Sequence, residues 1–171
     1  RTAYLKANYP IEYMVAFLST YSDNMEKIPS AIAECRRLGI KMLPPDINRS
    51  QAGFAIEKDD ENNGAIRFGL ASIKNVGSSP IEHILSGRDS GGNFESIEDF
   101  SYRTDLRNIN KKVLESLIKV GVFDSLGSRK TLLESLNKII SLSQTKQRAQ
   151  ESGQVSMFDL WGQSLPAAKV N

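Results

Sequence analysis

The stretch "IKNVGSSPIEHIL", residues 73–85, decides the fold of this 171-residue chain. Apolar residues flank a short turn, from Lys74 to Gly77, and the turn leads into a segment with helical apolar spacing. Ser78 and Ser79 are candidate helix caps, and Pro80 suits the first turn of a helix, where its missing N–H needs no acceptor. The stretch therefore predicts a tight turn that runs directly into a helix.

This layout is that of a helix-hairpin-helix element, and its chemistry suits a phosphate group. A helix start leaves backbone N–H groups without intrahelical partners, and the helix dipole adds positive potential there. Such a site binds the DNA backbone and reads no bases. The predicted DNA-binding residues are Lys74, Asn75, Val76, Gly77, Ser78 and Ser79.

The stretch departs from the usual form of the element in one position. Two glycines normally flank the apolar residue of the turn, whereas here Asn75 stands at the first position and only Gly77 remains. Asparagine adopts left-handed backbone angles more readily than most residues, so we expect the turn to persist. The alternative is a plain corner between two helices, with Gly77 as its hinge and no DNA contact.

Segments before this stretch predict helices and one small β-hairpin. Pro10 divides residues 1–22 into two helical pieces, and a second amphipathic segment ends at Gly39. The Pro44-Pro45 pair marks a boundary. Residues 52–58 and 65–70 alternate apolar and polar side chains on either side of an Asn63-Gly64 hairpin signal.

Segments after it predict helices only. One begins at Ser96, one has its apolar stripe at residues 113–118 and ends at Gly121, and one has its stripe at residues 132–140. The stripe stops near residue 143, where we expect fraying or a linker. The predicted fold class is mainly α with a small β-hairpin, a helical domain that contains one helix-hairpin-helix element.

Composition limits the remaining function classes. With 40% hydrophobic residues, 25% charged residues and a net charge of +2, the chain is an ordinary globular one, although residues 103–130 carry seven cations against three acids. One cysteine, Cys35, excludes an internal disulfide and favours a reducing compartment. No apolar run is long enough to span a membrane. A lone His83 has no partner ligands, acids 59–61 are expected to be solvated, and we identify no catalytic or metal-binding residues.

The tail "SGQVSMFDLWG", residues 152–162, raises a separate question. Met157, Phe158, Leu160 and Trp161 are large apolar side chains within a polar, patternless region. Exposed apolar clusters usually mark an interaction surface. The residues either fold back on their own domain or bind another protein.

Five blocks together resemble one known family. They are "RTAYLKANYPIEYMVAFLS", "RRLGIKMLPPDINRS", "IRFGLASIKNVG", "NKKVLESLIKVGVFDSLG" and "SGQVSMF", at residues 1–19, 36–50, 66–77, 110–127 and 152–158. In this order they resemble the C-family of replicative DNA polymerases, the alpha subunits of bacterial DNA polymerase III. The resemblance covers nearly the whole chain.

The resemblance implies a division of the chain and a set of partners. Residues 1–45 would end a fingers domain, residues 46–143 would form the helix-hairpin-helix domain, and residues 144–171 would be a linker and clamp-binding tail. "QVSMF" resembles the pentapeptide that binds the sliding clamp (beta subunit), with Gln154 at the mouth of the clamp pocket and Met157 and Phe158 on its floor. Double-stranded DNA and other polymerase III holoenzyme subunits are the further expected partners, with no membrane.

The resemblance also predicts what the piece lacks. The chain opens without methionine, as an excised piece of a DNA-directed DNA polymerase would, and the palm with its metal-binding aspartates would lie upstream. We therefore expect no cofactor here, although the parent is expected to use magnesium, and no polymerase activity. The expected location is the bacterial cytoplasm.

Three other functions remain open. The chain could come from an error-prone C-family polymerase, against which "QVSMF" argues, because such relatives need not carry a clamp motif. It could belong to an unrelated repair or recombination protein, against which the blocks at 1–50 and 110–127 argue. The third is an interaction module without DNA contact.

Overall fold

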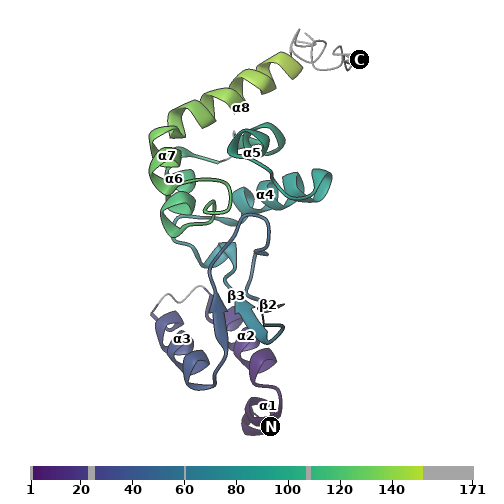
Figure 1. The fold of residues 1–171 in the computed structure, drawn as a ribbon, viewed down its shortest axis with the longest axis vertical. Helices are drawn as coiled ribbons and strands as arrows, with labels where there is room; N and C mark the ends of the chain where they lie inside the picture. Colours follow the sequence, from purple (N-terminus) through teal and green to yellow (C-terminus); the bar gives the residue numbers. More distant parts are fainter. Residues whose placement is uncertain (1, 23–25, 60, 107–108, 152–171) are drawn as a thin grey trace, which may run out of the picture.

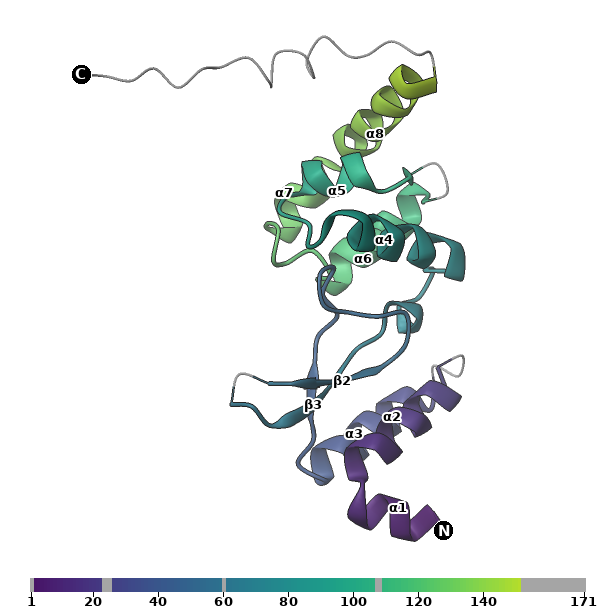
Figure 2. The ribbon, with the colours of Figure 1, turned by 90° about the vertical axis from the view of Figure 1, so that its right-hand side faces the viewer.

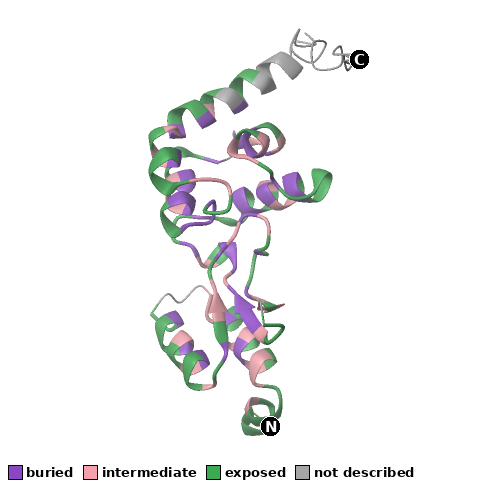
Figure 3. Cartoon of the chain, in the orientation of Figure 1, coloured by how far each residue is buried: buried purple, intermediate pink, exposed green. Residues whose placement is uncertain are grey.

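The computed structural model describes residues 2–22, 26–59, 61–106 and 109–151, which form two lobes joined by two adjacent chain segments (Figures 1 and 2). The N-terminal lobe contains helices α1 to α3 and a three-stranded sheet, and the helical lobe contains α4 to α8. Each lobe has buried residues on its inner side and exposed residues on its outer surface (Figure 3). The described part of the chain is mainly α-helical, as the sequence predicts.

Three helices begin the N-terminal lobe: α1 (Thr2–Asn8), α2 (Pro10–Thr20) and α3 (Ile28–Arg37). The predicted division at Pro10 is confirmed, because Pro10 is the first residue of α2, where no N–H is needed. Met14 and Leu18 are buried on the face that the sequence assigns to the core. Gly39, with φ +71°, follows α3 in the left-handed conformation that commonly ends a helix.

The sheet of this lobe contains one more strand than the sequence predicts. Its strands are β1 (Lys41–Leu43), β2 (Ala55–Lys58) and β3 (Gly64–Arg67), in the order β1-β3-β2. The predicted hairpin is confirmed by the antiparallel pairing of β2 with β3, whereas β1 pairs with β3 in parallel. The Asp59 N–H donates to the Asn63 oxygen at 2.9 Å across the reversal, Asn62 adopts φ +63°, and Gly64 is already paired with Lys58 in the ladder.

Asp59 has a structural role in this reversal. Its Oδ1 accepts the N–H groups of Asn63 at 2.8 Å and Glu61 at 3.0 Å, and Lys41 lies 3.5 Å from its other oxygen. The hydrogen bond from the Asn63 N–H is the largest cause that lowers the pKa of Asp59. Its side chain is 5% exposed, so the expectation of solvated acids is wrong for Asp59, and Asp60 lies outside the described residues.

The helical lobe follows a single 3-10 turn. Its elements are η1 (Leu70–Ser72), α4 (Ser78–Gly91), α5 (Ile97–Arg103), α6 (Lys111–Val120), α7 (Arg129–Glu134) and α8 (Leu136–Glu151). Ser96 caps α5 by accepting the Asp99 N–H at 3.1 Å, as its position predicts. Asn110 caps α6 by accepting the Val113 N–H, and Gly121 ends α6 at φ +92°.

The last predicted helix is divided and longer than expected. It is interrupted at Ser135, between α7 and α8. The backbone of α8 continues to Glu151, beyond residue 143, where the apolar stripe stops. The prediction of fraying there is therefore wrong for the backbone up to Glu151. Residues 152–171 lie outside the described residues.

Two hydrophobic clusters form the cores of the lobes. One joins α2 and α3 to the sheet and includes Phe54 and Ile66, and the other fills the helical lobe around Phe94, Phe100 and Phe123. The first cluster thus extends past residue 45, the predicted domain boundary, because the hairpin packs on α2. No described helix is both long enough and apolar enough to cross a bilayer.

Candidate nucleic-acid interface

The backbone of the turn at residues 73–77 has the conformation that the sequence predicts. Asn75 adopts φ +69°, the left-handed region, at the position where a glycine is usual. The Val76 N–H donates to the Ile73 carbonyl oxygen at 3.2 Å and closes the turn. Asn75 therefore supplies the backbone geometry for which the usual form of the element uses glycine.

The apolar residues of this turn anchor it to the helical lobe. Ile73 and Val76 are 6% and 8% exposed and belong to its hydrophobic cluster. The Asn75 amide also donates to the hydroxyl of Ser116 on α6 at 3.3 Å. Two buried apolar side chains and a hydrogen bond to α6 thus fix the turn, while Lys74, Asn75 and Gly77 remain exposed.

The start of α4 carries the uncompensated polar groups. Its N-cap is Gly77, so Ser78 and Ser79 lie inside the helix, and no side chain caps it among the described residues. The prediction that either serine caps α4 is wrong. The first four N–H positions of a helix have no intrahelical acceptor. In α4 these belong to Gly77, Ser78 and Ser79, since Pro80 has no N–H, and the first turn contains no acidic residue.

Neither the backbone angles nor the packing within the chain requires glycine at position 77. Its φ of −83° is available to any residue, and a Cβ added there would meet only the Pro80 side chain, at 4.0 Å. The space over this residue opens to solvent. A glycine here leaves the N–H groups of the helix start accessible to an external ligand.

Lys74 supplies a cation beside these N–H groups. It is exposed, and within the described ranges no carboxylate lies within ion-pair distance of it. A mobile ammonium group beside several helix-start N–H groups is an arrangement that attracts an anion such as a phosphate. The structure therefore brings together all six residues predicted from the sequence, with Val76 acting as a buried anchor rather than a contact.

The other predicted site residues are placed as follows. Gln154, Met157 and Phe158 lie outside the described residues, so the clamp-binding assignment stays a prediction. Among the residues that the structure describes, no cluster of three or more His, Cys, Asp and Glu side chains could hold a metal ion. His83 lies partly buried on α4.

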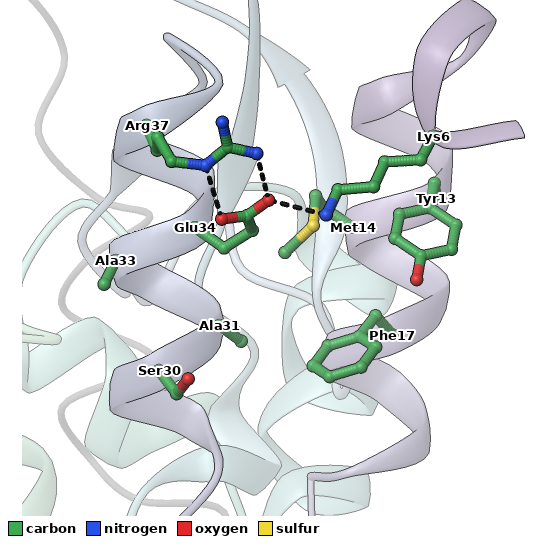
Figure 4. A pocket seen from close by; sticks show the side chains of 9 residues that line it. All are labelled: Lys6, Tyr13, Met14, Phe17, Ser30, Ala31, Ala33, Glu34 and Arg37. Carbon is green, nitrogen blue, oxygen red and sulfur yellow. Dashed lines mark hydrogen bonds and ion pairs between the residues drawn. The ribbon is translucent and has the colours of Figure 1, made fainter. Parts of the chain in front are cut away.

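A recess of about 410 Å³ lies between α2 and α3 (Figure 4). Tyr13, Met14 and Phe17 form its apolar side, and Glu34 lies at its mouth between Arg37 and Lys6, at 2.7 and 2.6 Å. These two cations lower the pKa of Glu34 to about 2, with the Arg37 hydrogen bond as the larger cause. The carboxylate is therefore ionised and engaged near neutral pH, which suits an ion pair and not an acid–base catalyst.

Sequence reasoning missed a second turn of related sequence, at residues 118–128, which starts within the last turn of α6. Ile118-Lys119-Val120-Gly121 repeats the residue types of Ile73-Lys74 and Val76-Gly77, and it also leads into a helix, α7. Here the Gly121 and Val122 N–H groups donate to the Ile118 and Leu117 carbonyl oxygens, which is a Schellman ending of α6. The repeated Ile-Lys and Val-Gly pairs could have shown this from the sequence.

Comparison with known proteins agrees with this description. A family of helix-hairpin-helix motifs matches residues 39–133. DNA polymerase III subunit alpha of Escherichia coli K12 is 41% identical over 159 residues, 92% of this chain and 13% of that protein. The subunits of Mycobacterium tuberculosis H37Rv and Thermus aquaticus are 44% and 40% identical over 163 and 158 residues. These matches cover 94% and 92% of this chain, which spans about an eighth of the length of these relatives.

Proposed function

We propose a function on the premise that this chain belongs to the helix-hairpin-helix family and is homologous to a segment of DNA polymerase III subunit alpha. Within a replicative polymerase, the segment binds the backbone of duplex DNA without reading its sequence. The observation that carries this proposal is the uncapped start of α4 beside Lys74. Its N–H groups and one cation together suit a phosphate oxygen.

Binding through one such turn is weak and depends on salt. Each phosphate that the protein neutralises releases counterions, so affinity falls as salt rises. Contacts to phosphate fix the position of the protein on the duplex and carry no sequence information. A replicative polymerase needs this kind of contact, because it moves along every sequence that it copies.

The experiment that tests this function is a duplex titration at low salt with Lys74→Glu combined with Gly77→Asp. The double variant places two carboxylates where the phosphate would lie. The matched control is Lys58→Glu with Gly53→Asp, which makes the same change in net charge on two exposed residues, one in β2 and one in the segment before it. We expect the first variant to lose binding and the control to keep it, and equal binding by both would reject the proposed site.

We propose further that the tail binds the sliding clamp. The support is the sequence "QVSMF", with Gln154 as a polar contact and Met157 and Phe158 as apolar anchors. A pentapeptide alone is expected to bind at about micromolar Kd, or roughly −8 kcal/mol. Held on the same duplex as the DNA-binding turn, the two weak contacts reinforce one another through effective concentration.

Met157→Ala combined with Phe158→Ala tests the clamp contact. Truncating two anchor side chains is expected to cost roughly 3–5 kcal/mol of binding, with no change in melting temperature. Leu160→Ala with Trp161→Ala is the matched control, since it removes apolar residues just outside the pentapeptide. Clamp binding that survives the first pair and fails with the second would reassign the contact to Leu160 and Trp161.

The chain itself is proposed to be inactive as a polymerase, since its resemblance places the palm and its magnesium-binding aspartates upstream. Primer extension with the purified chain should give no template-dependent incorporation. Incorporation above background, retained after a further purification step, would contradict this. The bacterial cytoplasm is the location proposed for the parent, where the DNA and the clamp are found.

A further inference from the structure

The two chain segments that join the lobes are bonded to one another. We call residues 44–54 and 68–72 the connector. Its backbone hydrogen bonds run from the Leu70 N–H to the Gln51 oxygen at 3.0 Å and from the Ala71 N–H to the Ala52 oxygen at 2.9 Å. The backbones of Gly53 and Gly69 lie so close that a Cβ on Gly69 would not fit. The connector is thus a paired structure and not a flexible linker.

Side chains fix the shape of the first connector segment. Asp46 Oδ1 accepts the Asn48 N–H at 2.8 Å, and the Asp46 N–H donates to the Ser50 hydroxyl at 3.0 Å. The Ser50 hydroxyl in turn donates to the Phe68 carbonyl oxygen at 2.7 Å and is fully buried. These bonds tie the turn at residues 46–50 to the end of β3.

The same turn is bonded to the helical lobe. The Asn48 amide donates to the Phe94 oxygen at 2.9 Å and accepts the Phe94 N–H at 2.7 Å, just beyond the end of α4. The Ile47 N–H donates to the Val122 oxygen at 2.8 Å. Through buried or partly buried hydrogen bonds, this short turn therefore contacts the helical lobe and, through Ser50, the residue that follows β3.

Arg88 connects this turn to the last turn of α4. Its side chain is buried, at 8% exposure, and it donates to the Ser50 oxygen at 2.8 Å, the Ile47 oxygen at 3.4 Å and Gln51 Oε1 at 3.3 Å. All three acceptors are neutral, and the ion pairs of the described residues include none of Arg88. A buried cation without a counterion depends on its hydrogen bonds, so its position is sharply specified.

The same end of α4 has a second contact, on the side of α5. Arg103 of α5 lies against Gly87 and Gly91, donates to the Gly87 oxygen at 2.9 Å and pairs with Asp99 at 2.8 Å. This contact orients α4 within the helical lobe, whereas the Arg88 contact orients it against the connector. Arg88 thus links the helix that begins at the phosphate-facing turn to the segment that enters the N-terminal lobe.

We infer that Arg88 is a positioning residue for DNA binding, which holds α4 and the turn before it in a fixed orientation relative to the N-terminal lobe. This inference rests on the proposed function of the turn. Arg88 is buried and reaches the connector, so it does not touch the duplex. Its effect is preorganisation: the N–H groups of the α4 start already lie where the phosphate will bind.

The test measures duplex affinity as a function of salt for Arg88→Met and Arg88→Lys in the full chain. Arg36→Met is the matched control, because Arg36 is exposed on α3 and its loss changes the charge equally. We expect Arg88→Met to weaken binding about tenfold with an unchanged salt slope, the control to change it by less than about twofold, and Arg88→Lys to lie between. Parent-like affinity of Arg88→Met would overturn the inference, and a slope reduced by about one would make Arg88 a direct phosphate contact.

Amide hydrogen exchange without DNA separates this inference from the proposed function. If Arg88 positions α4, the N–H groups of α4 exchange faster in Arg88→Met, while those of α2 and α3 do not. If the parent chain binds no duplex, the proposed function fails and exchange still tests the coupling. Unchanged exchange of the α4 N–H groups in Arg88→Met would overturn the inference that Arg88 positions α4. Should Arg88→Met not fold, Arg88→Lys decides by the same two measurements, and parent-like behaviour in both would reject the role.

Discussion

The first turn, residues 73–77, and the second turn, residues 118–128, have similar sequences and opposite surroundings. Both have an Ile-Lys pair and a Val-Gly pair before a helix. In the second turn the Asp124, Leu126 and Gly127 N–H groups all donate to oxygens within the turn. In the first, only the Val76 N–H does so among the described backbone bonds outside regular elements. The local sequence pattern thus specifies a turn, and the neighbouring residues determine whether its N–H groups have acceptors within the turn. We call a turn open when they do not and closed when they do.

The two turns also differ in whether their cations are paired with carboxylates. In the second turn Arg129 binds both oxygens of Asp124, at 2.8 and 2.5 Å, and Lys119 binds Glu115 at 2.5 Å. In the first turn Lys74 has no such carboxylate within the described part of the chain. A cation that is already paired gains less from a phosphate, because the first pair must be broken. We therefore propose that the DNA contact lies at the first turn and that the second is a structural corner.

The largest expected effect concerns the glycines of the two turns. Gly121→Ala forces a left-handed residue to carry a Cβ that meets Arg129 and Asp124, so it should lower the free energy of unfolding by about 2 kcal/mol. For a chain of this size that lowers the melting temperature by about 4–8 °C. Gly77→Ala, at φ −83° and with free space, should leave the melting temperature nearly unchanged. If thermal unfolding showed the same fall in melting temperature for both variants, the two glycines would not differ in their structural role.

A smaller effect is expected when the second turn is opened. Asp124→Asn releases Arg129, so the variant should gain up to about one unit of salt slope in duplex binding if pairing is what keeps the turn closed. Glu12→Gln is the control, since Glu12 is exposed on α2 and the net charge changes equally. A gain in the control as large as in Asp124→Asn would show that net charge alone controls binding.

The smallest expected effect is on acid stability. The Arg129 hydrogen bond is the first cause that lowers the pKa of Asp124 below its ordinary value. Stability from this pair is thus present above the ordinary pKa, near 4, and is lost as pH falls through the lowered folded value. Because both side chains are about half exposed, the amount should stay below about 1 kcal/mol.

Urea unfolding of the parent and Asp124→Asn between pH 6 and pH 2 measures this effect. The two stabilities should converge as the pH falls below about 4. A difference that is constant with pH would show that the carboxylate charge contributes nothing to the second turn. Glu12→Gln again serves as the control for a general change in charge.

Local signals predicted most of the helices. Pro10, Ser96 and Gly121 each act on backbone groups within a few residues, so their effect is visible in a short window of sequence. The conformation of Asn75 was predicted for the same reason. The strand that the sequence did not predict depends on a non-local contact. β1 pairs with β3 across more than twenty residues, and no periodicity in "KML" indicates this pairing.

The candidate site was predicted in part, for a related reason. The turn residues could be identified from their own sequence, but the contact of Asn75 with Ser116 and that of Arg88 with Ser50 join distant segments. The serines at the start of α4 illustrate the opposite error. Ser78 and Ser79 have the right chemistry for caps, and a shift of one residue in the helix start places both inside α4.

The measurement that tests the central claim most directly compares Lys74→Gln with Lys119→Gln. The two lysines occupy corresponding positions of the repeated sequence, Lys74 in the turn before α4 and Lys119 in the last turn of α6, and each variant removes one positive charge. The dependence of duplex affinity on salt, determined for both and for the parent, reports how many phosphates each protein neutralises. We predict that Lys74→Gln lowers the salt slope by about 0.9 and that Lys119→Gln leaves it unchanged. Equal slopes for the two variants, or a reduced slope for Lys119→Gln alone, would contradict the assignment of the DNA contact to the first turn.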